Sequence, residues 1–187
     1  MTPDIETTSV PAWAVAPGRG NADLTGRYWT LVAIDSSADA TGPAALIVAD
    51  WTKQILATHP DANPRVHRVA DDRAALAAVT TDLSCALVGW RLMIAGPANL
   101  CLRLRAHALA HHVGDDEIVV ASTDVTHRDV YCVHCRAVTR AAVELDDVLE
   151  CAGCGRRLAV QAHVSRRIGA HLGVLAHAED VSARADP

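Results

Sequence analysis

The sequence contains no phenylalanine, and its aromatic side chains belong to four tryptophans and two tyrosines. Its single lysine is Lys53, so arginine carries almost all of the positive charge. A formal net charge of −5 and the lack of a basic stripe argue against nucleic acid as the main partner. No apolar run reaches membrane-spanning length, because Asp50 interrupts the longest one, residues 44–51. Nucleic-acid-binding and membrane-spanning proteins are therefore disfavoured.

The first residues show no secretory signal, since residues 1–15 include acids and lack both a basic region and an apolar region. We therefore expect a soluble, cytoplasmic protein. In a reducing compartment, paired cysteines are metal ligands more often than disulfides. Half of the 187 residues are apolar, which is enough for one ordinary domain with a small appended module.

Strand and helix patterns alternate along residues 27–123, after an irregular N-terminal arm, residues 1–26, that we expect to lie over a partner. Strands are expected at 27–34, 65–70, 84–96 and 116–123. The helices between them are expected to begin near Pro43, at a cap provided by Asp71 or Asp72, and after Pro97. Such alternation predicts an α/β domain with a mostly parallel, doubly wound sheet.

The turn at residues 94–100, IAGPANL, resembles the end of the nicotinamide-binding domain of ferredoxin-reductase-like enzymes, where a Cys-Gly-Pro turn follows a buried strand. Ala95 stands here in place of that cysteine. No GxGxxG motif occurs, and the loop after the first strand offers only Gly42. We therefore expect a ferredoxin-reductase-like (Rossmann-like) fold without a bound dinucleotide.

Residues 124–175 form a second, small β module that carries most of the cysteines, and residues 176–187 form a polar tail. Two Cys-x-x-Cys pairs are separated by 15 residues: Cys132, Cys135, Cys151 and Cys154. Two such turns joined by a hairpin direct four thiolates at one ion, so this spacing is typical of a zinc ribbon. Gly153 and Gly155 are the small residues that a tight second turn needs, and both can take positive φ without penalty.

Zinc is the expected metal, and four protein ligands would make the site closed and structural. The same ligand set suits a single iron or an iron–sulfur cluster, so an electron-transfer role stays open. The cysteines outside the pairs, Cys85 and Cys101, are expected to be buried as small apolar side chains. Arg103 and Arg105 are expected on a solvated face. The arginines that flank the site could offset its charge or face a partner: Arg136, Arg156 and Arg157.

Residues 85–175 resemble the DmmA family through GWRLMIAGPANLCLRLRAHAL, VYCVHC, ELDDVL followed by the second cysteine pair, and HVSRR. That family is the small (gamma or accessory) subunit of bacterial dimethylamine monooxygenase. The resemblance implies a complex that converts dimethylamine, O₂ and NADPH into methylamine and formaldehyde. Haem would lie on one partner subunit, and FMN and a [2Fe–2S] cluster on a reductase partner.

The resemblance implies an assembly role for this chain, with zinc on its four cysteines and no catalytic residues of its own. Two other classes of function stay open. One is an electron-transfer subunit, with iron at the cysteines or a nucleotide on the α/β domain. The other is a zinc-ribbon module with a nucleic-acid-binding or regulatory role.

Overall fold

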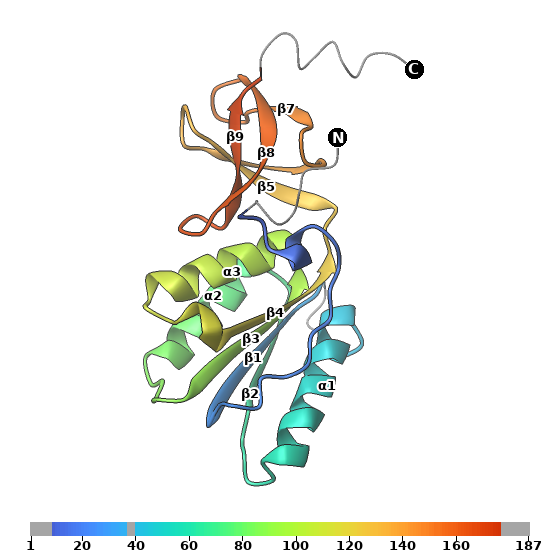
Figure 1. Cartoon of the computed structure of the whole chain (residues 1–187), viewed down its shortest axis with the longest axis vertical. Coiled ribbons are helices and arrows are strands. Elements are labelled where there is room, and N and C mark those ends of the chain that lie inside the picture. Colours follow the sequence, from blue (N-terminus) through green and yellow to red (C-terminus); the bar gives the residue numbers. More distant parts are fainter. Residues whose placement is uncertain (1–8, 37–39, 177–187) are drawn as a thin grey trace.

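The fold was obtained as a computed structural model that describes residues 9–36 and 40–176. A helix-covered sheet forms one end of the molecule, and a second sheet forms the other (Figure 1). In the described ranges no helix is both long and apolar enough to cross a membrane.

The first sheet is parallel, with the strand order β2-β1-β3-β4. Its strands are β1 (Tyr28–Ile34), β2 (Arg65–Val69), β3 (Trp90–Pro97) and β4 (Ile118–Asp124). The helices are α1 (Pro43–Thr58), α2 (Asp72–Leu83) and α3 (Ala98–Ala110), and the short 3₁₀ turns are η2 (Ala12–Ala14) and η3 (Asp115–Glu117). The prediction of a parallel α/β sheet is confirmed.

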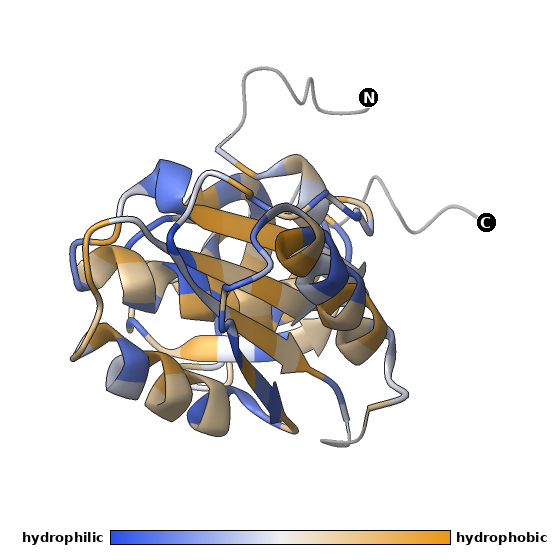
Figure 2. Cartoon of the chain, turned by 90° about the horizontal axis from the view of Figure 1, so that it is seen from below, coloured by the Kyte–Doolittle hydropathy of each residue, from blue (hydrophilic) through white to orange (hydrophobic). Residues whose placement is uncertain are grey.

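Two apolar layers hold this sheet between helices, because successive strand residues point to opposite faces. Leu31 and Met93 pack toward α1 with Trp51. Val32 and Ile94 face the other way, toward α2 and α3. The central strands β1 and β3 are accordingly apolar along most of their length and are covered on both faces (Figure 2), as is usual for a parallel sheet, whereas the edge strand β2 is mostly polar.

The helix starts follow the expected signals. Pro43 is the first residue of α1, and the Asp71 carboxylate accepts a hydrogen bond of 2.8 Å from the backbone N–H of Ala74. The prediction of one long strand over residues 84–96 is wrong for its first half, since β3 begins at Trp90. Residues 84–89 form an exposed connection from α2, and Gly89, at φ 90°, turns the chain into β3. Local apolar character suggested a strand, but the chain has to cross from β2 past β1 before it can pair again.

The N-terminal segment, residues 9–26, lies against its own chain. Gly18 forms an antiparallel bridge with Ser122 of β4, and the Trp51 indole donates a hydrogen bond of 2.7 Å to the carbonyl of Gly20. At the other end of this segment, the Ser9 hydroxyl accepts a hydrogen bond of 3.0 Å from the backbone N–H of Val164, in the second sheet. The segment therefore ties the two sheets together.

The second sheet has the strand order β6-β5-β9-β8-β7. Its strands are β5 (His127–Cys132), β6 (Val138–Ala142), β7 (Val148–Glu150), β8 (Arg157–Ser165) and β9 (Ala170–Leu175). Two antiparallel hairpins, β5–β6 and β7–β8, flank the last strand, which pairs parallel with β5 and antiparallel with β8. Of the expected tail, 176–187, only Ala176 lies within the described residues.

Candidate metal centre

The four paired cysteines lie at the ends of the two hairpins, in two turns of matching geometry that we call the knuckles. In the first knuckle, the N–H of Arg136 donates to the carbonyl of Cys132 at 2.8 Å. In the second, the N–H of Gly155 donates to the carbonyl of Cys151 at 2.9 Å. Each knuckle closes with a further 2.9 Å bond from its first cysteine, to Ala137 or to Arg156. The sequence between the cysteines differs, yet the backbone is folded in the same way twice.

The four sulfur atoms form a compact cluster, and all lie within 4.8 Å of one another. The Sγ atoms of Cys132 and Cys154 are 3.9 Å apart, and those of Cys135 and Cys151 are 3.5 Å apart. A tetrahedral zinc ion with Zn–S bonds of about 2.3 Å holds its sulfurs about 3.8 Å apart. The cluster therefore fits such an ion, and Cys132 and Cys151 are almost fully buried.

The surrounding backbone makes the cluster suited to a cation. The N–H of Gly153 points at the Cys151 sulfur at 3.4 Å and is the main cause that lowers the pKa of this thiol to about 6. The N–H of Ala137 acts in the same direction on Cys135, but burial and the protons of neighbouring thiols raise the pKa of Cys135 to about 12. Four sulfurs this close compete for protons, so one thiol has a lowered pKa and its neighbour a raised one. A metal ion that displaces the protons would bind all four as thiolates.

The two glycines of the second knuckle have different roles. Gly155 has φ 68°, as expected, and Arg136 takes the matching place in the first knuckle at φ 67°. Gly153 is not among the glycines at positive φ and is needed for space instead. A Cβ at that position would lie 2.6 Å from the Cβ of Ala137 and 3.1 Å from the Sγ of Cys135. The absence of a side chain lets the two knuckles approach each other.

An ionic network centred on one buried carboxylate joins this module to the α/β part. Asp129, on β5, is 2% exposed and accepts hydrogen bonds of 2.7 and 3.1 Å from the Arg140 guanidinium. Arg103 of α3 lies 4.0 Å from Asp129 and also pairs with Asp72. The solvated face expected for Arg105 is wrong, since it is 14% exposed and pairs with Asp115, whereas Arg103 is 38% exposed and keeps part of its side chain in solvent. Sequence spacing could not show the contacts of Arg103, because Asp72 and Asp129 lie far from it along the chain.

The place where a dinucleotide phosphate binds in doubly wound folds is taken by a side chain of this chain. The Asp35 carboxylate, just after β1, accepts hydrogen bonds of 3.0 and 2.9 Å from the backbone N–H groups of Ala44 and Ala45 in the first turn of α1. In phosphate-binding folds these N–H groups contact the ligand. Gly42 makes room for this cap, since a Cβ there would lie 2.3 Å from the carboxylate.

The two remaining cysteines differ in their surroundings. Cys101 is buried in α3, as expected, and burial raises its pKa. The burial expected for Cys85 is wrong, because it lies on the exposed connection after α2, with its sulfur 3.1 Å from the Arg65 guanidinium. His111 is the C-cap residue of α3.

These features define a β module built around a candidate four-thiolate metal centre and fixed to an α/β domain. Residues 129–174 match the family model described as the C-terminal domain of the DmmA-like dimethylamine monooxygenase subunit. This part of the chain is similar to that domain family.

A curated relative agrees with the family match. The chain is 40% identical over 101 residues to the "Heme-dependent oxidative N-demethylase delta subunit" of Ectopseudomonas mendocina (strain ymp). The aligned region covers 54% of this chain and 57% of the relative, which is named a delta subunit rather than a gamma subunit. No solved structure matches the chain significantly. The two sequence comparisons confirm the resemblance to the DmmA-like family.

Proposed function

We propose that this chain is a non-catalytic accessory subunit of a haem-dependent, amine-oxidising complex, and that its four paired cysteines hold one structural zinc ion. The observation that carries the proposal is the closed cluster of four sulfurs within 4.8 Å, in a module that matches the DmmA-like C-terminal domain. Four protein ligands fill a tetrahedral site and leave no position for water or substrate. Zinc would therefore supply folding free energy to the module.

The proposed complex is a cytoplasmic dimethylamine monooxygenase that converts dimethylamine, O₂ and NADPH into methylamine and formaldehyde. Its haem would lie on an oxygenase subunit, and its FMN and [2Fe–2S] cluster on a reductase subunit. The curated relative supports this proposal through its name, which describes a subunit of a heme-dependent N-demethylase. In this complex the present chain would hold the haem and reductase subunits together.

The α/β part is proposed to be a ferredoxin-reductase-like scaffold that binds no nucleotide. The strand order β2-β1-β3-β4 supports a doubly wound arrangement, in which ligands bind where the direction of winding changes, between β1 and β3. The Asp35 carboxylate supports the lack of a nucleotide, because it already satisfies the N–H groups of α1 and would repel a phosphate.

Elemental analysis and a visible absorption spectrum of the purified chain test the proposal. We expect about one zinc per chain and no visible band. Cys132→Ser should lose the zinc and lower the yield of assembled complex, whereas Cys85→Ser should keep the zinc, because Cys85 lies outside the cluster. Iron with visible thiolate bands would replace the structural assignment with electron transfer through the same four sulfurs.

A further inference from the structure

One edge of the α/β domain presents apolar side chains to solvent at the amino ends of the strands, away from the second sheet (Figure 1). On the connection from α2 to β3, Leu87 is 61% exposed and Val88 is 95% exposed. Tyr28, the first residue of β1, is 47% exposed beside them. Together with Arg27 and Arg65, these residues form what we call the amino-edge surface. Solvation of two aliphatic side chains next to an aromatic one is unfavourable, and such patches commonly mark interaction sites.

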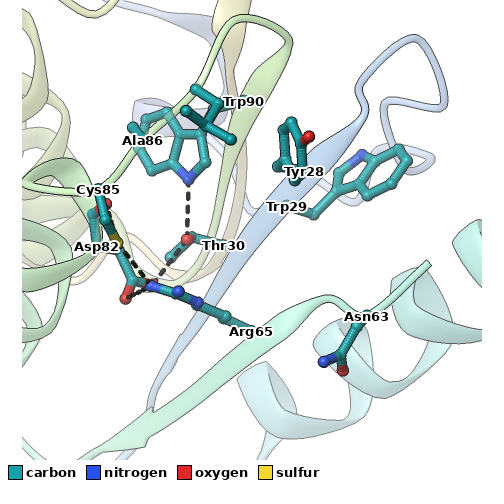
Figure 3. Close-up of a pocket in the computed structure, with 10 residues that line it drawn as sticks. Tyr28, Trp29, Thr30, Asn63, Arg65, Asp82, Cys85, Ala86 and Trp90 are labelled. Carbon is teal, nitrogen blue, oxygen red and sulfur yellow. Dashed lines mark hydrogen bonds and ion pairs between the residues drawn. The ribbon is translucent and has the colours of Figure 1, made fainter.

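A pocket of about 170 Å³ opens at this surface. Its floor is a buried polar chain in which the Trp90 indole donates to the Thr30 hydroxyl at 3.0 Å, and Thr30 donates to the Asp82 carboxylate at 2.7 Å (Figure 3). Asp82 is 4% exposed and also accepts from Arg65 and His67. Three donors satisfy this carboxylate, so the floor is a fixed structure.

The charged side chains that keep free hydrogen-bonding groups at this surface are two arginines, Arg65 and Arg27. One nitrogen of Arg65, Nη1, is used by Asp82 and Cys85. Its Nε and Nη2 bond to none of the described residues, and the side chain is 56% exposed. Arg27 is exposed with its side chain against Gly89, and it has no acidic partner in the part of the chain that the structure describes. Two guanidinium groups beside an apolar rim favour an occupant that combines an apolar group with a carboxylate.

We propose that the amino-edge surface is the docking site for a partner subunit, which covers Leu87 and Val88 with an apolar segment and places a carboxylate against Arg27 and Arg65. This inference rests on the proposed function, since it assigns a surface to the assembly role. A protein fits better than a small molecule, because a molecule that fills the pocket would leave the protruding Val88 in water. It also fits better than a second copy, because a two-fold contact would bring the same arginines face to face.

A binding assay with purified variants tests this site. Each variant is titrated with the haem-bearing subunit and with the reductase subunit of the proposed complex, both taken from the same organism. Leu87→Asp and Val88→Asp should each weaken binding to one of these subunits at least about tenfold. The matched control is Leu46→Asp, at a residue of α1 that is 56% exposed, and it should stay within about twofold of the unchanged chain. Arg27→Glu should weaken binding about tenfold and Arg68→Glu should not, because Arg68 is exposed on β2 outside the amino-edge surface. Circular dichroism and metal content show whether each variant is folded.

The outcomes separate this inference from the proposed function. If the unchanged chain binds a subunit and the amino-edge variants bind it equally well, the docking site is refuted and the accessory role stands. If the unchanged chain binds neither subunit, both proposals fail. If light scattering shows a dimer that Leu87→Asp disrupts while partner binding is intact, the surface joins two copies of this chain and the proposed partner is refuted.

Discussion

The matching knuckles predict opposite effects for two substitutions at equivalent positions. Arg136 and Gly155 both follow the second cysteine of a pair, at φ 67° and 68°. A residue with a Cβ pays roughly 1–2 kcal/mol in this left-handed conformation. Gly155→Ala should therefore destabilise the module, and Arg136→Gly should stabilise it.

The expected magnitudes follow from the space around each position. A Cβ at Gly155 would have its nearest neighbour at 3.7 Å, so the cost is conformational only. The Arg136 side chain is exposed and makes no hydrogen bond or ion pair with the described residues, so its removal loses no contact. Because glycine costs roughly 0.5–1 kcal/mol in chain entropy, the net change should be about 1 kcal/mol in each direction.

Thermal unfolding of the metal-loaded chain at a fixed metal concentration measures this difference. For a chain of this length, about 1 kcal/mol corresponds to a change in Tm of about 2–4 °C. Gly155→Ala should lower Tm by that amount and Arg136→Gly should raise it. Gly153→Ala serves as a steric comparison. It should lower Tm further and weaken metal binding, because its Cβ would overlap Ala137.

Two results would refute this reasoning. If Arg136→Gly and Gly155→Ala shift Tm in the same direction, the knuckles do not share a backbone conformation. If Gly155→Ala leaves Tm unchanged while Gly153→Ala lowers it, packing alone determines the stability of the second knuckle.

Three further predictions concern buried charges and caps. Asp35→Ala should lower the free energy of unfolding by about 0.5–2 kcal/mol in urea titrations, because α1 loses the cap on two N–H groups, and Asp61→Ala in an exposed turn should not. Burial, and then the charge of Arg128, lower the pKa of His171 to about 4 from 6.5, so the unfolded chain binds the proton first and stability falls as pH drops from 6.5 to 4. This difference in pKa corresponds to about 3 kcal/mol in the free energy of unfolding, and His171→Gln should remove that part of its pH dependence. An unchanged slope of unfolding free energy against pH would refute the prediction. Arg140→Ala should cost about 1.5–3 kcal/mol by leaving Asp129 with fewer donors, and Asp129→Asn in the same chain should reduce that cost in a double-mutant cycle.

Local signals in the sequence were sufficient for the order of the α/β elements. Apolar strands alternated with capped helices, and Pro43 and Asp71 marked two helix starts that the structure confirms. The same signals misplaced residues 84–89, where an apolar run is exposed to solvent. Hydrophobicity shows which segments are suited to burial, but it does not show which of them the chain path leaves at the surface.

For the candidate site, too, local sequence patterns predicted some features and only the tertiary structure showed the others. The spacing of the paired cysteines predicted one four-sulfur cluster, and the resemblance to the DmmA-like family could be recognised from residues around it. The ionic links of Asp129 to Arg140 and Arg103, and the amino-edge surface, were not visible in any local pattern. The link to Arg140 crosses the β5–β6 hairpin, whereas Arg103 and the residues of the amino-edge surface meet their neighbours only in the folded chain.

The sequence by itself determined the alternation of strands and helices, the clustering of the cysteines and the resemblance to the DmmA-like family, because each depends on spacing over a few residues or on a recognisable motif. The tertiary structure alone decided that the last strand enters the middle of the second sheet, that residues 9–26 bind the two parts together, and that the Asp35 carboxylate caps the first turn of α1. These features depend on long-range pairing, whose free energy comes from contacts between distant segments and leaves no periodic signal along the chain.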